Sequence, residues 1–162
     1  MRPPPCPAIR RGRDRSAALK GIGPGNAAPT SGASGTMAAP HLPGAAPIDA
    51  YGNGGFRFAG MSHRGSLLCL PGGIWASPVV SVTDLDESVL APVLAGEGPG
   101  TAVGHFLIGT GKDLVPLAPA LRAAFRNRGI AVEPMSTGAA VRTWNILLSE
   151  RRRIGALLVA VD

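Results

Sequence analysis

AVGHFLIGTGK (residues 102–112) is the stretch of sequence that decides the fold. An apolar segment runs into the glycine-rich turn Ile108–Lys112, and the same arrangement recurs at MSTGAA (residues 135–140). Each turn precedes an amphipathic segment, so the chain repeats a strand–turn–helix unit in tandem. Such units bring two helix starts to one edge of a parallel sheet, where open α/β domains bind ligands. The two turns therefore predict where a site would lie.

The residues around these turns predict strand–helix–strand–helix–strand over residues 102–161. Residues 102–108 form the first strand, and Pro116 opens a helix with one apolar stripe: Leu117, Ala120, Leu121, Ala124 and Phe125. Residues 130–135 form the second strand, and Ser136 or Thr137 caps the next helix, which ends at the cations Arg151–Arg153. The wholly apolar residues 154–161 predict a strand covered on both faces. This order implies that the three strands are parallel and joined by right-handed crossovers.

The N-terminal half favours antiparallel hairpins. Short strands are expected at residues 48–51, 56–58, 66–70, 74–76 and 79–82, with turns at residues 52–55 and 60–65. Residues 83–95 predict a helix that Pro92 makes short or kinked. We therefore expect an α/β fold for residues 47–162: a single three-layer domain and a mixed sheet, with a C-terminal βαβαβ parallel unit and N-terminal antiparallel β-hairpins.

Residues 1–46 differ in composition from the rest. They are rich in Pro and Gly, lack apolar periodicity and predict a disordered tail. They hold six basic residues against one acidic residue, so they carry +5 of the net charge of +6. This arm could bind nucleic acid or an anionic membrane, resemble a transit peptide, or be a solvated leader. It could also be translated upstream sequence, with Met37 as the true start.

Several functions are disfavoured by composition. The arm has no aromatic residue on which bases could stack, so no specific nucleic-acid binding is expected. No stretch reaches about 18 uninterrupted apolar residues, which disfavours a membrane span. Cys6 and Cys69 are the only cysteines, and their positions disfavour a disulfide. A reduced compartment fits best: the cytoplasm, or the mitochondrion if the source is eukaryotic.

The two turns and the second helix supply a candidate pocket for a small anion. Glycines let backbone N–H groups approach an anion, and Lys112 and Arg142 would add charge. The predicted set is Gly109, Thr110, Gly111, Lys112, Ser136, Thr137, Arg142 and Thr143. The turns match neither the phosphate-loop nor the dinucleotide pattern. The alternative is therefore a tight strand-to-helix turn in which the hydroxyls cap the helix.

Other reactive residues do not form a catalytic constellation. His41, His63 and His105 lack metal-site spacing; His105 is expected to be packed in the core and His63 to be exposed in a turn. Cys69 lies between leucines, which would raise the pKa of its thiol. No nucleophile–base pair is evident, so we expect no cofactor, no metal and no enzyme activity.

A further pattern points to a family. It comprises Gly55-Phe56, Gly60, Gly65-Ser66, Pro71, Trp75, Gly109-Thr110-Gly111 and the run Ser136–Asn145. Together these resemble the domain-of-unknown-function family that includes mitochondrial complex I assembly factor 3, over about residues 47–162. The resemblance implies a three-layer α/β domain without an established reaction. It also implies partners that are subunits or assembly factors of the respiratory NADH:ubiquinone oxidoreductase. Family members usually carry Tyr at Trp144 and often Gly near Arg151.

Two functions follow as hypotheses. The first is a non-enzymatic interaction protein similar to the assembly factor, with an exposed groove or apolar patch around Tyr51, Phe56 and Phe58. The second is an anion-binding or small-molecule-binding domain, and possible enzyme, built on Gly109–Lys112 and the helix start at Thr137. A deep pocket with converging donors at that edge would favour ligand binding, whereas a filled or flat edge would favour a partner surface.

Overall fold

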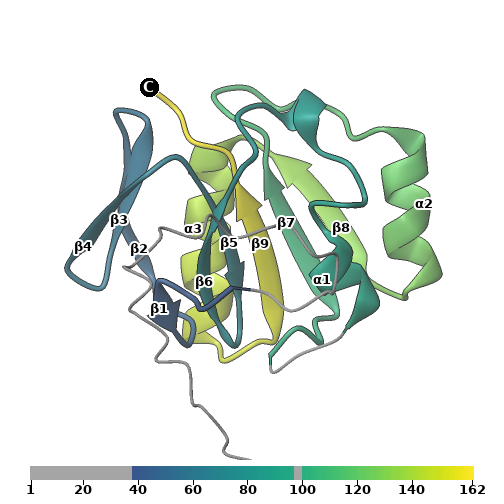
Figure 1. Ribbon diagram of the computed structural model, residues 1–162, viewed down its shortest axis with the longest axis horizontal. Coiled ribbons are helices and arrows are strands. Elements are labelled where there is room, and N and C mark those ends of the chain that lie inside the picture. The colour runs from purple at the N-terminus through teal and green to yellow at the C-terminus, as the bar shows by residue number, and fades with distance from the viewer. Residues whose placement is uncertain (1–37, 97–99) are drawn as a thin grey trace, which may run out of the picture. The chain divides into compact units, whose positions relative to one another are not determined.

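Two β-sheets organise the protein. The computed structural model describes residues 38–96 and 100–162, which lie within one compact unit. A six-stranded sheet has the order β1-β6-β5-β9-β7-β8 and a three-stranded sheet the order β2-β3-β4 (Figure 1). The strands are β1 Leu42–Pro43, β2 Ile48–Gly52, β3 Gly55–Phe58, β4 Met61–Arg64, β5 Ser66–Leu70, β6 Gly73–Ser77, β7 His105–Gly109, β8 Ala131–Met135 and β9 Ile154–Leu158.

The parallel unit has the predicted element order. β7 leads through helix α2 (Pro119–Asn127) to β8, and β8 leads through helix α3 (Thr137–Ser149) to β9. β8 and β9 both pair with β7 in parallel and lie on opposite sides of it. Because the two crossovers run in opposite directions along the sheet, right-handed connections place α2 and α3 on opposite faces.

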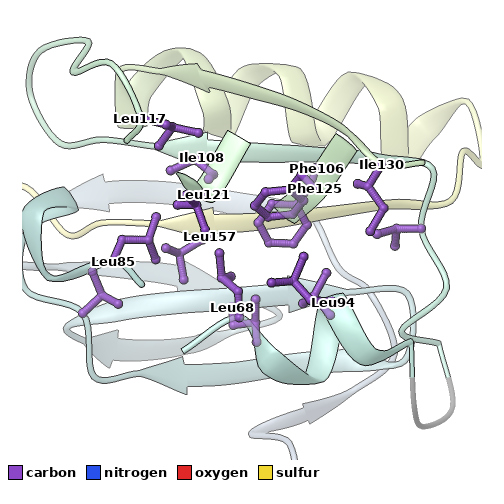
Figure 2. Close-up of a cluster of buried hydrophobic side chains, with 14 of the residues drawn as sticks. Leu68, Leu85, Leu94, Phe106, Ile108, Leu117, Leu121, Phe125, Ile130 and Leu157 are labelled. Carbon is purple, nitrogen blue, oxygen red and sulfur yellow. The ribbon is translucent and has the colours of Figure 1, made fainter. Parts of the chain in front are cut away.

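Each face of the six-stranded sheet carries its own core. On one face, Phe106 and Ile108 of β7 pack with Leu121 and Phe125 of α2 and with helix α1 (Ala91–Ala95) (Figure 2). The ring centroids of Phe106 and Phe125 lie 5.2 Å apart. On the other face, Leu107 packs with α3 and with the three-stranded sheet. The predicted three-layer α/β fold with a mixed sheet is confirmed.

The three-stranded sheet consists of two tight hairpins. Asn53 (φ 51°) and Gly54 (φ 71°) connect β2 to β3, and Ala59 (φ 49°) and Gly60 (φ 75°) connect β3 to β4. Two consecutive positive φ angles match the twist of the flanking strands, and Asn-Gly is a favoured pair for such a turn. The predicted turn at residues 60–65 is wrong, because residues 61–64 form β4. Ala59, in a conformation that alanine rarely adopts, gave no sequence signal for the second hairpin.

The segment between the two halves is less helical than predicted. The expected strand at residues 79–82 is absent, and Ser81 caps a short 3-10 helix, η1 (Val82–Asp84). Within the predicted helix at residues 83–95, only α1 is α-helical. The Asp86 carboxylate accepts hydrogen bonds from the backbone N–H groups of Ser88 and Val89, which forms a local turn in place of a continuous helix.

Three helix and strand ends also differ from prediction. α2 begins at Pro119, not Pro116, and β7 begins at His105, after Gly104. α3 ends at Ser149, and Arg151 has a φ of 59°. The three arginines therefore follow the helix and do not lie in its last turn.

The described part includes residues that were expected to belong to the tail. Residues 38–46 contain β1, and the carbonyl of Ala38 accepts a hydrogen bond from the Trp75 indole. Leu42, Ala45 and Ala46 pack against the core beneath α3. Residues 1–37, with the basic arm and Met37, lie outside the described residues, so the expectations for them stay predictions.

Candidate functional site

The predicted site lies at the carboxyl ends of β7 and β8. Gly109, the last residue of β7, is in register with Met135, the last residue of β8. The loop after β7 leads to α2 on one face, and the chain after β8 enters α3 on the other. Thr110 and Thr137 are therefore neighbours, as the tandem repeat predicted, in the place where α/β sheets form ligand crevices.

Hydrogen bonds close this crevice. The backbone N–H of Gly111 donates to Thr137 Oγ1 at 3.0 Å, and the N–H of Thr137 donates to the Gly111 carbonyl at 2.7 Å. Thr110 donates its N–H to the Met135 carbonyl at 2.8 Å. We call Thr110, Gly111, Met135 and Thr137 the latch, because these contacts join the loop after β7 to the start of α3.

Both latch hydroxyls are used inside the protein. Thr137 is fully buried, and its Oγ1 donates to the carbonyl of Val159 at 2.7 Å. Thr110 is buried; its Oγ1 accepts from the N–H of Val115 and lies within hydrogen-bond distance of the Asp113 and Met135 carbonyls. A hydroxyl has one proton to donate. Neither group is therefore turned toward a ligand.

Close backbone approach explains two of the glycines. A Cβ on Gly109 would lie 3.0 Å from the Cα of Thr137, so a side chain there would push α3 away from β7. A Cβ on Gly138 would lie 2.2 Å from the hydroxyl of Tyr51, which covers the first turn of α3. Packing against the backbone of α3 thus favours glycine at 109, whereas a side chain at 138 would require the exposed Tyr51 ring to move aside.

The other predicted site residues are dispersed. Ser136 caps α3: its hydroxyl accepts a hydrogen bond from the N–H of Ala139 at 3.4 Å, which is the helix-capping alternative to a ligand contact. Lys112 is exposed on the loop, and Arg142 is exposed on α3. Thr143 lines a different hollow, near the beginnings of β7 and β9. The structure brings together Gly109, Thr110, Gly111, Ser136 and Thr137; anion binding by the full set stays a prediction.

That second hollow has a volume of about 490 Å³. His105 Nε2 lies 3.3 Å from a carboxylate oxygen of Glu133, and Thr143, Leu147, Arg152 and Arg153 complete much of the lining. The expectation of a core position for His105 is wrong: its side chain is 37% exposed because α3 leaves this part of the sheet uncovered. The pair crosses from β7 to β8 on the face that carries α3.

Burial changes the pKa of both remaining reactive residues, His63 and Cys69. His63 belongs to β4, half-buried, with its ring centroid 5.1 Å from that of His41. Burial, and secondarily the neighbouring His41, lowers the pKa of His63. Burial raises the pKa of the Cys69 thiol, as predicted. Among residues 38–96 and 100–162, no group of three or more His, Cys, Asp or Glu side chains could hold a metal ion.

Sequence reasoning missed the role of Asn145. Its Oδ1 accepts from the N–H of Ile48 at 2.8 Å, and its Nδ2 donates to the Ile48 carbonyl at 2.9 Å. The neighbouring Trp144 indole donates to the carbonyl of Ala46 at 3.0 Å. Side chains of α3 thus pair with β2 as a neighbouring strand would. Both residues stood in the run that carried the family resemblance, which was the available signal.

The predicted apolar patch is largely internal. Phe56 and Phe58 are 2% and 1% exposed and belong to the core beneath α3. Only Tyr51, at 44%, is exposed. The alternation of Phe56-Arg57-Phe58 places both rings on one face, but that face packs on the main sheet, which period-two spacing alone does not reveal.

The fold and the latch define the class: a three-layer α/β domain whose ligand crevice is closed by its own hydroxyls. The chain belongs to the family described as a protein of unknown function (DUF498/DUF598), which matches residues 48–159. It is 42% identical over 120 residues to an uncharacterized protein of Rhodobacter capsulatus, covering 74% of this chain and 89% of that protein. The resemblance found in the sequence is confirmed.

Two further comparisons concern named proteins. The chain is 33% identical over 118 residues to mouse NADH dehydrogenase (ubiquinone) 1 alpha subcomplex assembly factor 3, covering 73% of this chain and 62% of that protein. The chain thus spans less than two thirds of the mouse protein's length. A crystal structure described as an outer membrane protein from Bartonella henselae has a TM-score of 0.69 and 48% identity, covering 75% of this chain and all of that one. Within the described ranges, no helix is both long and apolar enough to cross a membrane.

Proposed function

We propose that this chain is a non-enzymatic protein-binding factor that assists the assembly of the respiratory NADH:ubiquinone oxidoreductase. The mouse relative's name supplies the kind of process, since it is an assembly factor of this complex. Partners would be subunits of the complex or other assembly factors. The place of action would be the cytoplasm in a bacterium and the mitochondrion in a eukaryote.

The observation that carries the proposal is the closed crevice. In a ligand-binding α/β domain the donors at this edge would face a bound molecule. Here the Thr137 hydroxyl is bonded to Val159 and Gly111, and the Thr110 hydroxyl is bonded within its own loop. This arrangement supports a scaffold role for the edge and favours function through the outer surface.

A deletion experiment in the organism that encodes the chain tests the proposal. Cells without the chain should contain less assembled NADH:ubiquinone oxidoreductase, measured on native gels with in-gel NADH oxidation, and the full chain should restore it. A Lys112→Ala variant should restore it equally well, because the proposal gives that side chain no ligand to bind. An unchanged amount of the complex in the deletion strain would contradict the proposal.

The competing proposal is anion binding at Gly109–Lys112 and Thr137. Its support is the meeting of Thr110 and Thr137 at one sheet edge, beside exposed Lys112. Inorganic phosphate or a small dicarboxylate should then raise the melting temperature, and Lys112→Ala should reduce that rise. No rise with either probe would remove this alternative.

A further inference from the structure

The two sheets have four outer edges, and they differ in how they meet solvent. An unpaired edge strand presents free N–H and C=O groups, to which another chain can add as a new strand. The outer strands of the large sheet are β1 and β8, and those of the small sheet are β2 and β4. The described chain protects these edges to different degrees.

A proline lies in each outer strand of the large sheet. β1 is two residues long and ends in Pro43. In β8, Ala131 donates its N–H to the Gly104 carbonyl, and the Met135 carbonyl accepts from Thr110. Because backbone groups alternate along a strand, residues 131, 133 and 135 face β7 and Pro134 faces the open side. The missing N–H of Pro134 therefore falls where an added strand would need it.

Helix α3 protects β2. Asn145 occupies both the N–H and the carbonyl of Ile48, and Trp144 occupies the carbonyl of Ala46 just before the strand. These side chains take the places that an added strand would use. The edge of β2 is therefore occupied at Ile48, where the strand begins.

Within residues 38–96 and 100–162, no comparable feature protects β4. Its sequence Met61-Ser62-His63-Arg64 contains no proline. Gly65 donates its N–H to the Gly54 carbonyl, in the same register that pairs Phe56 with His63 and Phe58 with Met61. By alternation, Ser62 and Arg64 turn their backbone N–H and C=O groups away from β3. Figure 1 shows β4 at the outer side of the small sheet.

The outer face beside this edge is cationic. The register pairs Arg57 with Ser62 and Gly55 with Arg64, so both arginines lie on the face opposite the buried Phe56 and Phe58. Both are exposed, and they line an open hollow of about 330 Å³ floored in part by Gly52 and Gly55. Within the described residues, the ion pair that forms is His105–Glu133, so neither arginine has a carboxylate partner there.

We infer that β4 accepts an extended acidic segment of a partner protein as a fourth strand. The partner's backbone would bond Ser62 and Arg64, and carboxylates at alternate positions would face Arg57 and Arg64. A second copy of this chain fits less well, because pairing β4 with β4 would bring four arginines to one face. The inference rests on the proposed function, since it names the surface by which a partner would be held.

Synthetic peptides test the surface on the full chain. The probe is a seven-residue peptide alternating Glu with Val or Thr; the controls are its Lys counterpart and a copy N-methylated on alternate residues. The acidic probe should shift the amide resonances of residues 55–64. The Lys peptide should not bind, and N-methylation should abolish binding, because it removes the backbone donors of an added strand.

Matched variants separate charge from backbone pairing. Arg57→Glu combined with Arg64→Glu should weaken binding about tenfold or more, since two charge-assisted contacts become repulsive. Arg122→Glu together with Arg126→Glu makes the same charge change on exposed positions of α2 and should leave binding unchanged. Ser62→Pro should remove the outward N–H and abolish binding. Because that proline could disturb β4, the glutamate pair is the decisive variant, with thermal melting to verify its fold.

The outcomes distinguish failure of the β4 surface from failure of the proposed function. Resonance shifts elsewhere, equal binding of the Lys peptide, or tolerance of the glutamate pair would overturn the inference. A dimer in analytical ultracentrifugation that Ser62→Pro converts to a monomer would also overturn it, in favour of a second copy. In cells, a glutamate pair that fully restores the oxidoreductase would refute this surface while the proposed function stands. A deletion without effect on the complex would instead refute the function.

Discussion

The latch and the β4 edge use the same kind of backbone groups in opposite ways. At the latch, the ends of β7, β9 and α3 satisfy one another through Thr137, which bonds both Gly111 and Val159. At β4, Ser62 and Arg64 turn their backbone N–H and C=O groups away from β3, where the described residues supply no partner. The described residues therefore bond the hydroxyls at the edge where α/β folds bind ligands, whereas we infer that the β4 edge accepts a strand. The comparison teaches that the position typical of a fold does not fix where this molecule can bind.

Removing the Thr137 hydroxyl should give the largest effect. Thr137→Val keeps the side-chain shape but leaves the buried Val159 carbonyl and the half-buried Gly111 N–H without their partner. A buried group left unpaired costs about 1–3 kcal/mol and the half-buried Gly111 N–H costs less, so unfolding free energy should fall by about 2–4 kcal/mol. Urea unfolding followed by tryptophan fluorescence measures it.

Thr143→Val is the matched control for this prediction. Thr143 lies on the same helix but is half-buried at the second hollow, so its substitution should change stability by less than about 0.5 kcal/mol. Equal effects of the two substitutions would mean that the latch is no more than ordinary helix packing, and the comparison would lose its first half.

Asn145 gives the next largest effect. Asn145→Ala removes both bonds to Ile48, and we expect a loss of about 1–3 kcal/mol. Hydrogen exchange at the Ile48 amide should rise more than exchange at the β7 amides, because the small sheet loses its attachment to α3. Ile146→Ala, on the exposed side of the same helix turn, should leave both measurements nearly unchanged. Uniform acceleration across the protein would contradict this local attachment.

The sequence predicted the parallel unit better than the small sheet. Helical spacing in residues 117–125 and the cap at Ser136 are local signals, and both were confirmed, although α2 begins at Pro119 and not at the predicted Pro116. The second hairpin depends on Ala59 at φ 49°, which local propensity disfavours and tertiary packing of Phe58 permits. Such a turn cannot be read from residue types alone.

The sequence predicted where the candidate site lies but not which groups its hydroxyls would bond. Glycine and threonine at two strand ends indicated that Thr110 and Thr137 would meet, and they do. Whether their hydroxyls face a ligand or the backbone depends on the positions of Val115 and Val159, which residue types do not specify. The pairing of Asn145 with Ile48 spans 97 residues and was equally invisible to local pattern.

Pro134 offers a smaller test, aimed at the protected edge. Pro134→Ala restores an N–H on the open side of β8 and should change stability by less than about 1 kcal/mol, since that group meets water. Self-association of the variant should increase, measured by sedimentation at several concentrations, because a second edge becomes able to pair. Leu114→Ala, which alters an exposed side chain elsewhere, should stay like the wild type. An unaltered sedimentation profile in Pro134→Ala would show that proline is not what protects β8.

The smallest expected effect is a pH dependence of stability that arises from His63 in the three-stranded sheet. Burial, and then the nearby His41, lowers the pKa of His63, so the folded protein binds that proton less readily than the unfolded chain. The unfolded value is about 6.5. Above it both states are neutral at this site and stability is unaffected. As the pH falls from there through the folded value, the unfolded state takes up more protons and stability decreases.

His63→Gln removes this contribution without adding charge. The melting temperature of the wild type should therefore fall more between pH 7.5 and pH 5 than that of the variant. Because the charge of His41 is the second cause of the shift, His41→Gln should reduce the dependence in part and not abolish it. Acid should also weaken the hold of β4 on the sheet, which exchange at the Phe56 amide would report. Identical pH profiles for wild type and His63→Gln would place the acid sensitivity elsewhere and leave β4 distinguished by its unpaired backbone and its arginines alone.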